Sequence, residues 1–285
     1  MRKEDGAELL VIPLLGYKPL IGMIHLPPTP SYVKDRVDID RLVDYALWEA
    51  GKLADAGFNA VIIENYGDHP YTVTAPSLSV LAIARIAAEV ARTYSGKLRV
   101  GINILRNAAP QALEAALVSG ASFIRVNSYC ELRVSMEGIL TPAAYIIERI
   151  REELRAPVLV FADVDVKHSA PLATASLEQI LHDCARRGRP DAIIVSGSAT
   201  GEPPSPGYVA SIKAMVPYKP IIIGSGISID NIMAYWRVAD GFIVGTSIKL
   251  NGKTLNPVDE RRARQLAELV NELRVKDYQK LGLKV

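Results

Sequence analysis

The chain has 285 residues, of which 49% are hydrophobic and 22% charged, and its formal net charge is +2. This balance is typical of a well-buried globular protein and excludes a disordered chain. Acidic and basic residues are interspersed, so no basic field exists to attract nucleic acid, and we expect no nucleic-acid partner. The two cysteines, Cys130 and Cys184, lack metal-type spacing, and we expect both to be reduced thiols of a cytoplasmic protein.

The first 18 residues precede the repeating pattern of the chain. Their apolar run at 9–15 is too short to span a bilayer, and Pro13 interrupts it. We interpret residues 1–18 as an N-terminal extension that pads the closed bottom of the fold, and we expect no stable membrane insertion. Peripheral contact with a membrane through this segment stays open.

Short apolar runs rich in Val and Ile then alternate with amphipathic segments. In chain order, each run is followed by its segment: 19–26 and 40–56, 60–65 and 77–94, 98–105 and 109–119, 123–128 and 142–154, 157–166 and 175–187, 192–197 and 206–215, 220–226 and 229–238, 241–247 and 258–275. Buried parallel strands with helical crossovers have this pattern. Eight such units predict a single (β/α)₈ TIM barrel over 19–275, followed by a tail at 276–285. An open doubly wound sheet is the alternative.

Polar residues follow the predicted strands at their carboxyl ends, which all point to one rim of a barrel. The candidate catalytic residues are His25, Glu64, Asp163, Lys167 and His168. The candidate ligand-binding residues are Asn103, Arg106, Arg125, Asn127, Asp165 and Ser196.

In the fifth predicted strand, Asp163, Asp165 and Lys167 lie two residues apart. The period of two places them on one face, which should be the barrel interior. A carboxylate that deep must be paired, and Arg125 on the neighbouring strand is a plausible partner. A purely structural ion-pair network is the alternative interpretation of this cluster.

Lys167 has two possible roles. Crowding by other cations in a dry site would lower its pKa and make it a base or a Schiff-base nucleophile. The carboxylates of Asp163 and Asp165 would oppose this change, so a charged Lys167 that stabilises an oxyanion is an equal alternative.

Two of the four histidines, His25 and His168, come at strand ends, where imidazole can exchange protons near pH 7. We expect His69 and His182 on the surface. His25 and His168 could bind a metal together with Glu64 and Asp163, but no local spacing such as HExxH supports this. We therefore predict no metal and no cofactor, with a divalent metal as the open alternative.

Glycines mark the ends of the last two strands, in IIIGSGISIDN and IVGTSIK. Backbone amides at such turns form the site that barrels commonly use for phosphate. The longer rim loops at 64–71 and 196–207 could cover the ligand. The predicted phosphate-binding residues are Gly197, Gly224, Ser225, Gly226, Ile227, Gly245, Thr246 and Ser247.

The sequence resembles the BtpA/SgcQ family over nearly its whole length. The resemblance rests on short motifs that are specific in combination: GMIHLPPTP (22–30), IIENYGDHP (62–70), GINILRN (101–107), FIRVN (123–127), ADVDVKH (162–168), VSGSATGEPP (195–204), GSGI and DGFIVGTSIKLNG (240–252). It implies a phosphate-binding (β/α)₈ barrel. The family name refers to photosystem I biogenesis in cyanobacteria, and the resemblance implies no agreed reaction.

Two functions therefore stay open. The first is a metabolic enzyme that binds a phosphorylated sugar or nucleoside-like small molecule, with isomerase, lyase or glycosidic cleavage chemistry. The alternative is a non-catalytic factor for the biogenesis or assembly of photosystem or other membrane proteins, which would need an exposed apolar surface such as 9–15. A homo-oligomer is also possible, because barrels often form pairs, although no predicted helix face indicates a subunit interface.

Overall fold

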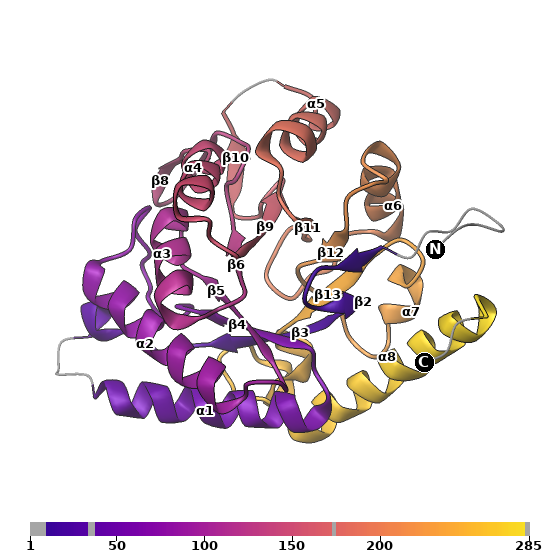
Figure 1. Cartoon of the computed structure of the whole chain (residues 1–285), viewed down its shortest axis with the longest axis horizontal. Coiled ribbons are helices and arrows are strands. Elements are labelled where there is room, and N and C mark those ends of the chain that lie inside the picture. The colour runs from indigo at the N-terminus through magenta and orange to yellow at the C-terminus, as the bar shows by residue number, and fades with distance from the viewer. Residues whose placement is uncertain (1–9, 34–37, 173–174, 283–285) are drawn as a thin grey trace.

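Eight parallel strands close into a barrel in the computed structural model of the chain, which describes residues 10–33, 38–172 and 175–282 (Figure 1). Each strand lies inside one predicted run, so the barrel prediction is confirmed. Around the barrel the order is β11-β12-β13-β3-β4-β5-β6-β9. The bounds are β3 Leu20–His25, β4 Ala60–Glu64, β5 Arg99–Asn103, β6 Phe123–Val126, β9 Leu159–Val164, β11 Ala192–Val195, β12 Ile221–Ile223 and β13 Gly241–Val244.

Helices surround the barrel and bury their apolar faces against it (Figure 1). They are α1 Ile39–Ala56, α2 Ser77–Thr93, α3 Ala109–Ser119, α4 Ala144–Leu154, α5 Leu177–Asp183, α6 Pro206–Met215, α7 Ile232–Tyr235 and α8 Glu260–Lys280. Three differ from the predicted segments. A π-helical turn continues α5 at Cys184–Gly188, α7 has only four residues, and α8 continues to Lys280.

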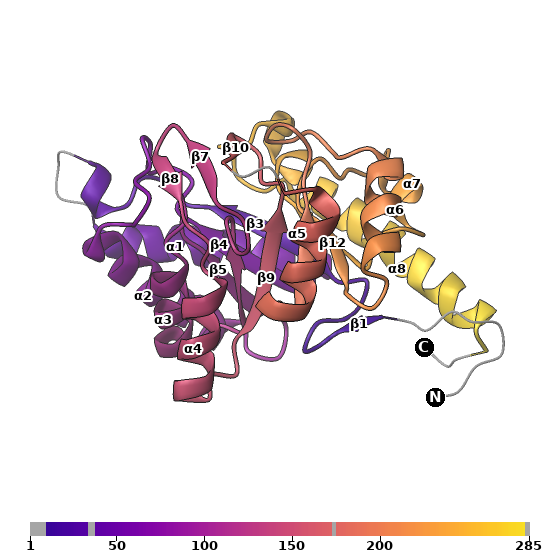
Figure 2. The same cartoon turned by 90° about the horizontal axis from the view of Figure 1, so that it is seen from above.

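A short N-terminal hairpin closes the lower end of the barrel. It pairs β1 (Val11–Ile12) with β2 (Gly16–Tyr17), and β1 lies at the opposite end from β7 and β8 in Figure 2. Ile12 and Leu15 are buried in the apolar cluster of the barrel interior, which explains how the hairpin is held. The start of the apolar run at 9–15 lies outside the described residues.

A small antiparallel sheet at the carboxyl end of the barrel was not predicted from the sequence. It has the order β10-β7-β8, from Ser169–Pro171, Arg133–Ser135 and Gly138–Leu140. Strands of three residues are too short to give a period-two signal. Figure 2 shows this sheet above the rim of the barrel.

Cys130 and Cys184 form a disulfide with their Cα atoms 5.4 Å apart. Our expectation of two reduced thiols is therefore wrong. The cysteines are 54 residues apart in sequence, and only the packing of the segment after β6 against the end of α5 brings them together.

The barrel interior has an apolar layer below and a polar layer above. Residues two apart in one strand face the same side, and each strand contributes to both layers. The apolar layer includes Met23, Ile62, Phe123, Phe161, Ile194, Ile222 and Ile243. Two positions higher in the strands stand His25, Glu64, Arg125, Asp163, Ser196, Gly224 and Gly245. The glycines that follow β12 and β13 at this level allow close packing, because a Cβ at Gly224 would lie 2.6 Å from the hydroxyl of Ser196 and one at Gly245 would lie 3.0 Å from the ring of His25.

Candidate functional site

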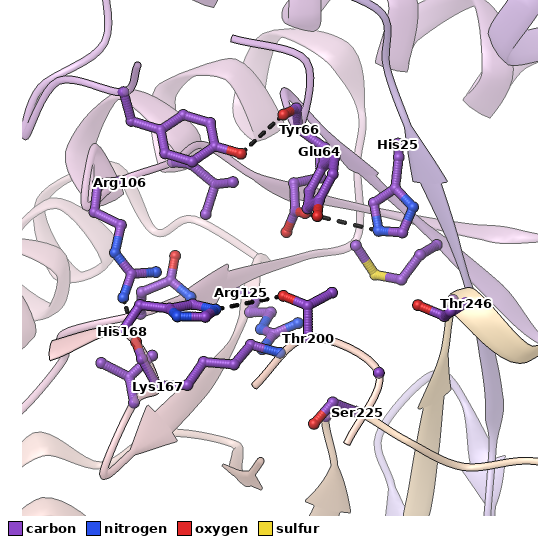
Figure 3. Close-up of a pocket in the computed structure, with 18 of the residues that line it drawn as sticks. His25, Glu64, Tyr66, Arg106, Arg125, Lys167, His168, Thr200, Ser225 and Thr246 are labelled. Carbon is purple, nitrogen blue, oxygen red and sulfur yellow. Dashed lines mark hydrogen bonds and ion pairs between the residues drawn. The ribbon is translucent and has the colours of Figure 1, made fainter. Parts of the chain in front are cut away.

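A pocket opens above the polar layer at the carboxyl ends of the strands, with about 790 Å³ of empty space including its mouth (Figure 3). Twelve of the predicted site residues line it: His25, Glu64, Arg106, Arg125, Asn127, Lys167, His168, Gly224, Ser225, Gly226, Gly245 and Thr246. The structure therefore brings these residues, which come from different strand ends, together around one pocket.

The remaining predicted residues lie beside or beneath the pocket. Asn103 and Asp163 are buried below it, where Asn103 donates a hydrogen bond of 2.6 Å to Glu64. Ser196 and Gly197 line a neighbouring depression. Ile227 is buried, and its carbonyl accepts a 2.6 Å hydrogen bond from the hydroxyl of Ser247; neither of these two residues lines the pocket.

Asp165 does not face the barrel interior, which corrects the prediction that residues 163, 165 and 167 share one face. The strand β9 ends at Val164, and Asp165 adopts a left-handed conformation with φ 49°. Its side chain is 54% exposed and pairs with Arg133 at 3.1 Å in the neighbouring depression. The alternation of side chains along a strand therefore ends with β9 at Val164, one residue before Asp165, and does not determine which way Asp165 points.

Arg125 and Asp163 form a two-pronged ion pair in the polar layer. Nε and Nη2 of Arg125 donate to the two carboxylate oxygens at 2.8 and 2.9 Å, and both side chains are buried. Burial alone would lower the pKa of Arg125, but the carboxylate of Asp163 raises it above its ordinary value. This pair is electrically neutral and holds the wall of the pocket.

Lys167 points into the pocket without a carboxylate partner of its own. Burial, and then the nearby charge of Arg125, lower its pKa to about 8, while Asp163 and Glu64 partly oppose this change. Among the described residues, no hydrogen bond or ion pair reaches its ammonium group. Lys167 is therefore mostly charged at pH 7, with a deprotonated fraction available. Beside it, the exposed His168 has a pKa lowered by burial and by Lys167.

His25 and Glu64 are a buried pair of titratable groups on neighbouring strands. Nδ1 of His25 lies 3.2 Å from the carbonyl oxygen of Thr254, which can only accept, so Nδ1 carries the hydrogen. Nε2 is then a free acceptor, 3.8 Å from Oε1 of Glu64. Burial and then Lys249 lower the pKa of His25 to about 3, and burial raises the pKa of Glu64. A neutral imidazole beside a carboxyl group that favours its proton is suited to proton transfer.

The buried, neutral His25 makes stability depend on pH. The pKa of His25 is about 3 in the folded chain and 6.5 ordinarily. Below pH 6.5, His25 is therefore protonated in the unfolded chain but stays neutral in the folded chain until the pH approaches 3. Stability is therefore lost as pH falls from 6.5 toward 3. Between pH 7.5 and 5, the parent should lose about 2 kcal/mol more unfolding free energy than a His25→Gln variant. Urea titrations at both pH values measure this, and equal losses would contradict it.

Several residues of the pocket were missed by the sequence analysis. The ring of Tyr66 packs on His25 with centroids 4.7 Å apart, and the hydroxyl of Tyr71 donates to the carbonyl of Tyr66 at 2.8 Å. Thr200 comes from the loop after β11, as Figure 3 shows. His69, which we expected only on the surface, is exposed but lines the pocket mouth. All four belong to the two rim loops that the sequence did indicate.

The glycine turns leave several backbone amides free on the side of β12 and β13. Among the described residues, no hydrogen bond uses the N–H groups of Gly226, Ile227, Thr246 or Ser247. The hydroxyl of Ser225, by contrast, is engaged, because it donates to the carbonyl of Glu202 at 2.7 Å. A ligand held here would meet mainly backbone donors.

Gly226 is required by the loop after β11. A Cβ atom at this position would lie 2.0 Å from the nitrogen of Pro203, and its φ is +74°. We expect Gly226→Ala to cost roughly 2–4 kcal/mol of unfolding free energy, from overpacking and backbone strain together. Gly207→Ala is the matched control, because a Cβ there meets nothing within 4 Å. Equal stability of the two variants would contradict the packing described.

Two further properties bear on the site. Among residues 10–33, 38–172 and 175–282, no group of three or more His, Cys, Asp or Glu side chains is placed to hold a metal ion. In the same part of the chain, none of the helices has both the length and the apolar character needed to cross a bilayer.

The fold and the pocket define a (β/α)₈ barrel with a cation-lined pocket at the carboxyl ends of its strands. The chain belongs to the BtpA family, whose model matches residues 16–272. It is 40% identical over 265 residues to an uncharacterised protein of Methanocaldococcus jannaschii, covering 93% of this chain and all of that protein. It is 34% identical over 256 residues to the photosystem I biogenesis protein BtpA of Synechocystis, covering 90% of this chain and 89% of that protein.

Solved structures share the fold at low sequence identity. One is the N-(5'-phosphoribosyl)anthranilate isomerase from Pyrococcus furiosus, with a TM-score of 0.53 and 11% identity. The match covers 90% of this chain and all of that one. It establishes a common (β/α)₈ architecture.

Proposed function

We propose that this protein is a metabolic enzyme that acts on a phosphorylated small molecule, either a sugar phosphate or a nucleoside-like phosphate. The observation that carries the proposal is that free backbone amides and an unpaired lysine belong to one pocket. The amides are those of Gly226 and Thr246, and the lysine is Lys167. An isomerase of a phosphoribosyl compound, built on the same fold, supports this ligand class.

In this proposal the two halves of the pocket have different tasks. The turns of β12 and β13 hold the phosphate through their amides. Lys167, His25 and Glu64 surround the reacting carbon, with one group to move a proton and one to stabilise the developing oxyanion. Such an arrangement supports isomerase, lyase or glycosidic cleavage chemistry.

Thermal-shift measurements with a library of phosphorylated metabolites test the proposal, followed by turnover assays on the compounds that stabilise the protein. A Thr246→Glu variant should lose the stabilisation, because its carboxylate would repel the phosphate. Lys97→Glu, at an exposed position away from the pocket, is the control that changes charge alone. If no phosphorylated compound stabilises the parent, or Thr246→Glu responds as the parent does, the proposal fails.

The alternative of an assembly factor takes its support from the name of the Synechocystis relative. It needs an exposed apolar surface, and the large hydrophobic side chains exposed in the N-terminal hairpin are Val11 and Leu14, each 54%, while Ile12 and Leu15 are buried. A chain truncated before Pro19 would therefore lose part of its core. Val11→Ser with Leu14→Ser tests the alternative without this damage. Loss of membrane or partner association in a stable double variant would favour it.

A further inference from the structure

Three polar groups in the pocket have no partner, and they do not lie in the glycine turns. Nε of Arg106 and Oδ1 of Asn127 are buried without any hydrogen bond among the described residues. Arg106 is only 6% exposed and Asn127 only 4% exposed. The third group is the ammonium of Lys167. Buried polar groups are almost always hydrogen-bonded, so the buried Nε of Arg106 and Oδ1 of Asn127 indicate the chemistry of a ligand, and the half-buried ammonium of Lys167 adds a positive charge beside them.

Arg106 presents the edge with which guanidinium groups bind carboxylates. Its Nη2 donates one hydrogen to the carbonyl of Lys167 at 2.5 Å, and this carbonyl fixes the plane of the guanidinium. Nε donates no hydrogen bond among the described residues. Arg125 holds Asp163 through the same two nitrogens. The nearest carboxylate to Nε of Arg106 is that of Glu137, at 3.9 Å, which is beyond hydrogen-bond distance.

The charges of this wall favour a second anionic group on the ligand. Asp163 neutralises Arg125, whereas Arg106 and Lys167 lie on the same side of the pocket without a hydrogen-bonded carboxylate (Figure 3). Burial lowers the pKa of Arg106, as expected for a cation whose charge is poorly compensated. Oδ1 of Asn127 needs a donor, and a hydroxyl group would supply one.

We infer that the ligand is a phosphorylated sugar acid, with its carboxylate between Arg106 and Lys167 and a neighbouring hydroxyl on Asn127. The inference rests on the proposed phosphate site and specifies the other end of the same molecule. A sugar phosphate without a carboxylate would leave Nε of Arg106 without a hydrogen-bond acceptor and Lys167 without a carboxylate partner, which costs binding free energy.

Calorimetric titration with matched pairs of compounds tests the inference. Each pair is an aldonate phosphate and the alditol phosphate of equal chain length, from three to six carbons, so that only the carboxylate differs. For the best chain length, the acid should bind at least about tenfold more tightly than the alditol. In Arg106→Gln this preference should fall to within about threefold.

Further variants separate the causes. Arg106→Lys keeps the charge but not the paired donors, so it should recover only part of the preference. Glu137→Gln removes the competing carboxylate and should tighten acid binding by about threefold. Arg85→Gln, at an exposed surface position, is the control.

The outcomes distinguish this inference from the proposed function. Equal binding of acid and alditol phosphates, or a preference that survives in Arg106→Gln, overturns the inference and leaves the phosphate site intact. Failure of both compounds and of inorganic phosphate to bind overturns both. Circular dichroism and the affinity for alditol phosphate show whether Arg106→Gln is folded, and Arg106→Lys provides the answer if it is not.

Discussion

Replacing Asp163 by alanine is expected to lower the free energy of unfolding by about 3–5 kcal/mol. The carboxylate accepts two hydrogen bonds from Arg125, and both side chains are buried, with 6% of Arg125 and none of Asp163 exposed. Removal of one partner leaves a buried guanidinium without compensation. Urea denaturation followed by far-UV circular dichroism measures the loss.

A double variant provides the control for this prediction. Arg125→Met with Asp163→Leu replaces both charges by apolar groups of similar volume, and its stability should lie within about 1 kcal/mol of the parent. A loss below about 1 kcal/mol in Asp163→Ala would mean that Arg125 finds other partners, and the neutral pair could then not be treated as the fixed wall of the pocket.

Replacing Lys167 by methionine should lower kcat by at least about 100-fold once a substrate has been found, because the variant lacks the cation that the proposed function places next to the reacting carbon. Affinity should also depend on pH. With a pKa of about 8, Lys167 loses its charge as pH rises from 7 to 9.5, and a ligand that is already fully ionised at pH 7 should bind about tenfold more weakly. Calorimetry at pH 7, 8 and 9.5 measures this.

Two variants separate charge from proton transfer at this position. Lys167→Arg keeps the cation and should keep binding across the pH range while turnover falls. Lys167→Met should bind weakly with no step near pH 8. A parent whose affinity is constant between pH 7 and 9.5 would contradict the assignment of Lys167 as the cation that the ligand meets.

The barrel and most of its pocket could be predicted because both depend on short-range patterns. Buried parallel strands read as continuous apolar runs, and a polar residue that follows such a run, such as Glu64 or Arg125, must face the rim. Amphipathic periodicity likewise predicted the helices around them. In the structure Glu64 and Arg125 lie at this rim, and Arg125 pairs with Asp163 as the sequence analysis predicts.

Other features depend on where the chain turns after an element ends, which local patterns do not contain. Asp165 was placed inside the barrel because the period of two was extended past the last residue of β9. Tyr66 and Thr200 lie on loops, where no periodic pattern in the sequence predicts that they line the pocket. The disulfide joins positions whose proximity follows only from the closed barrel.

The bond between Cys130 and Cys184 closes a covalent ring in the chain. The strand β9 lies within this ring, and so do Asp163, Lys167 and His168. A single backbone cut anywhere between the two cysteines would leave one covalent molecule, which migrates as one band without reductant and as two bands after reduction. The segment that carries the lysine is thus tethered at both ends to the body of the barrel, and it could be nicked without being released.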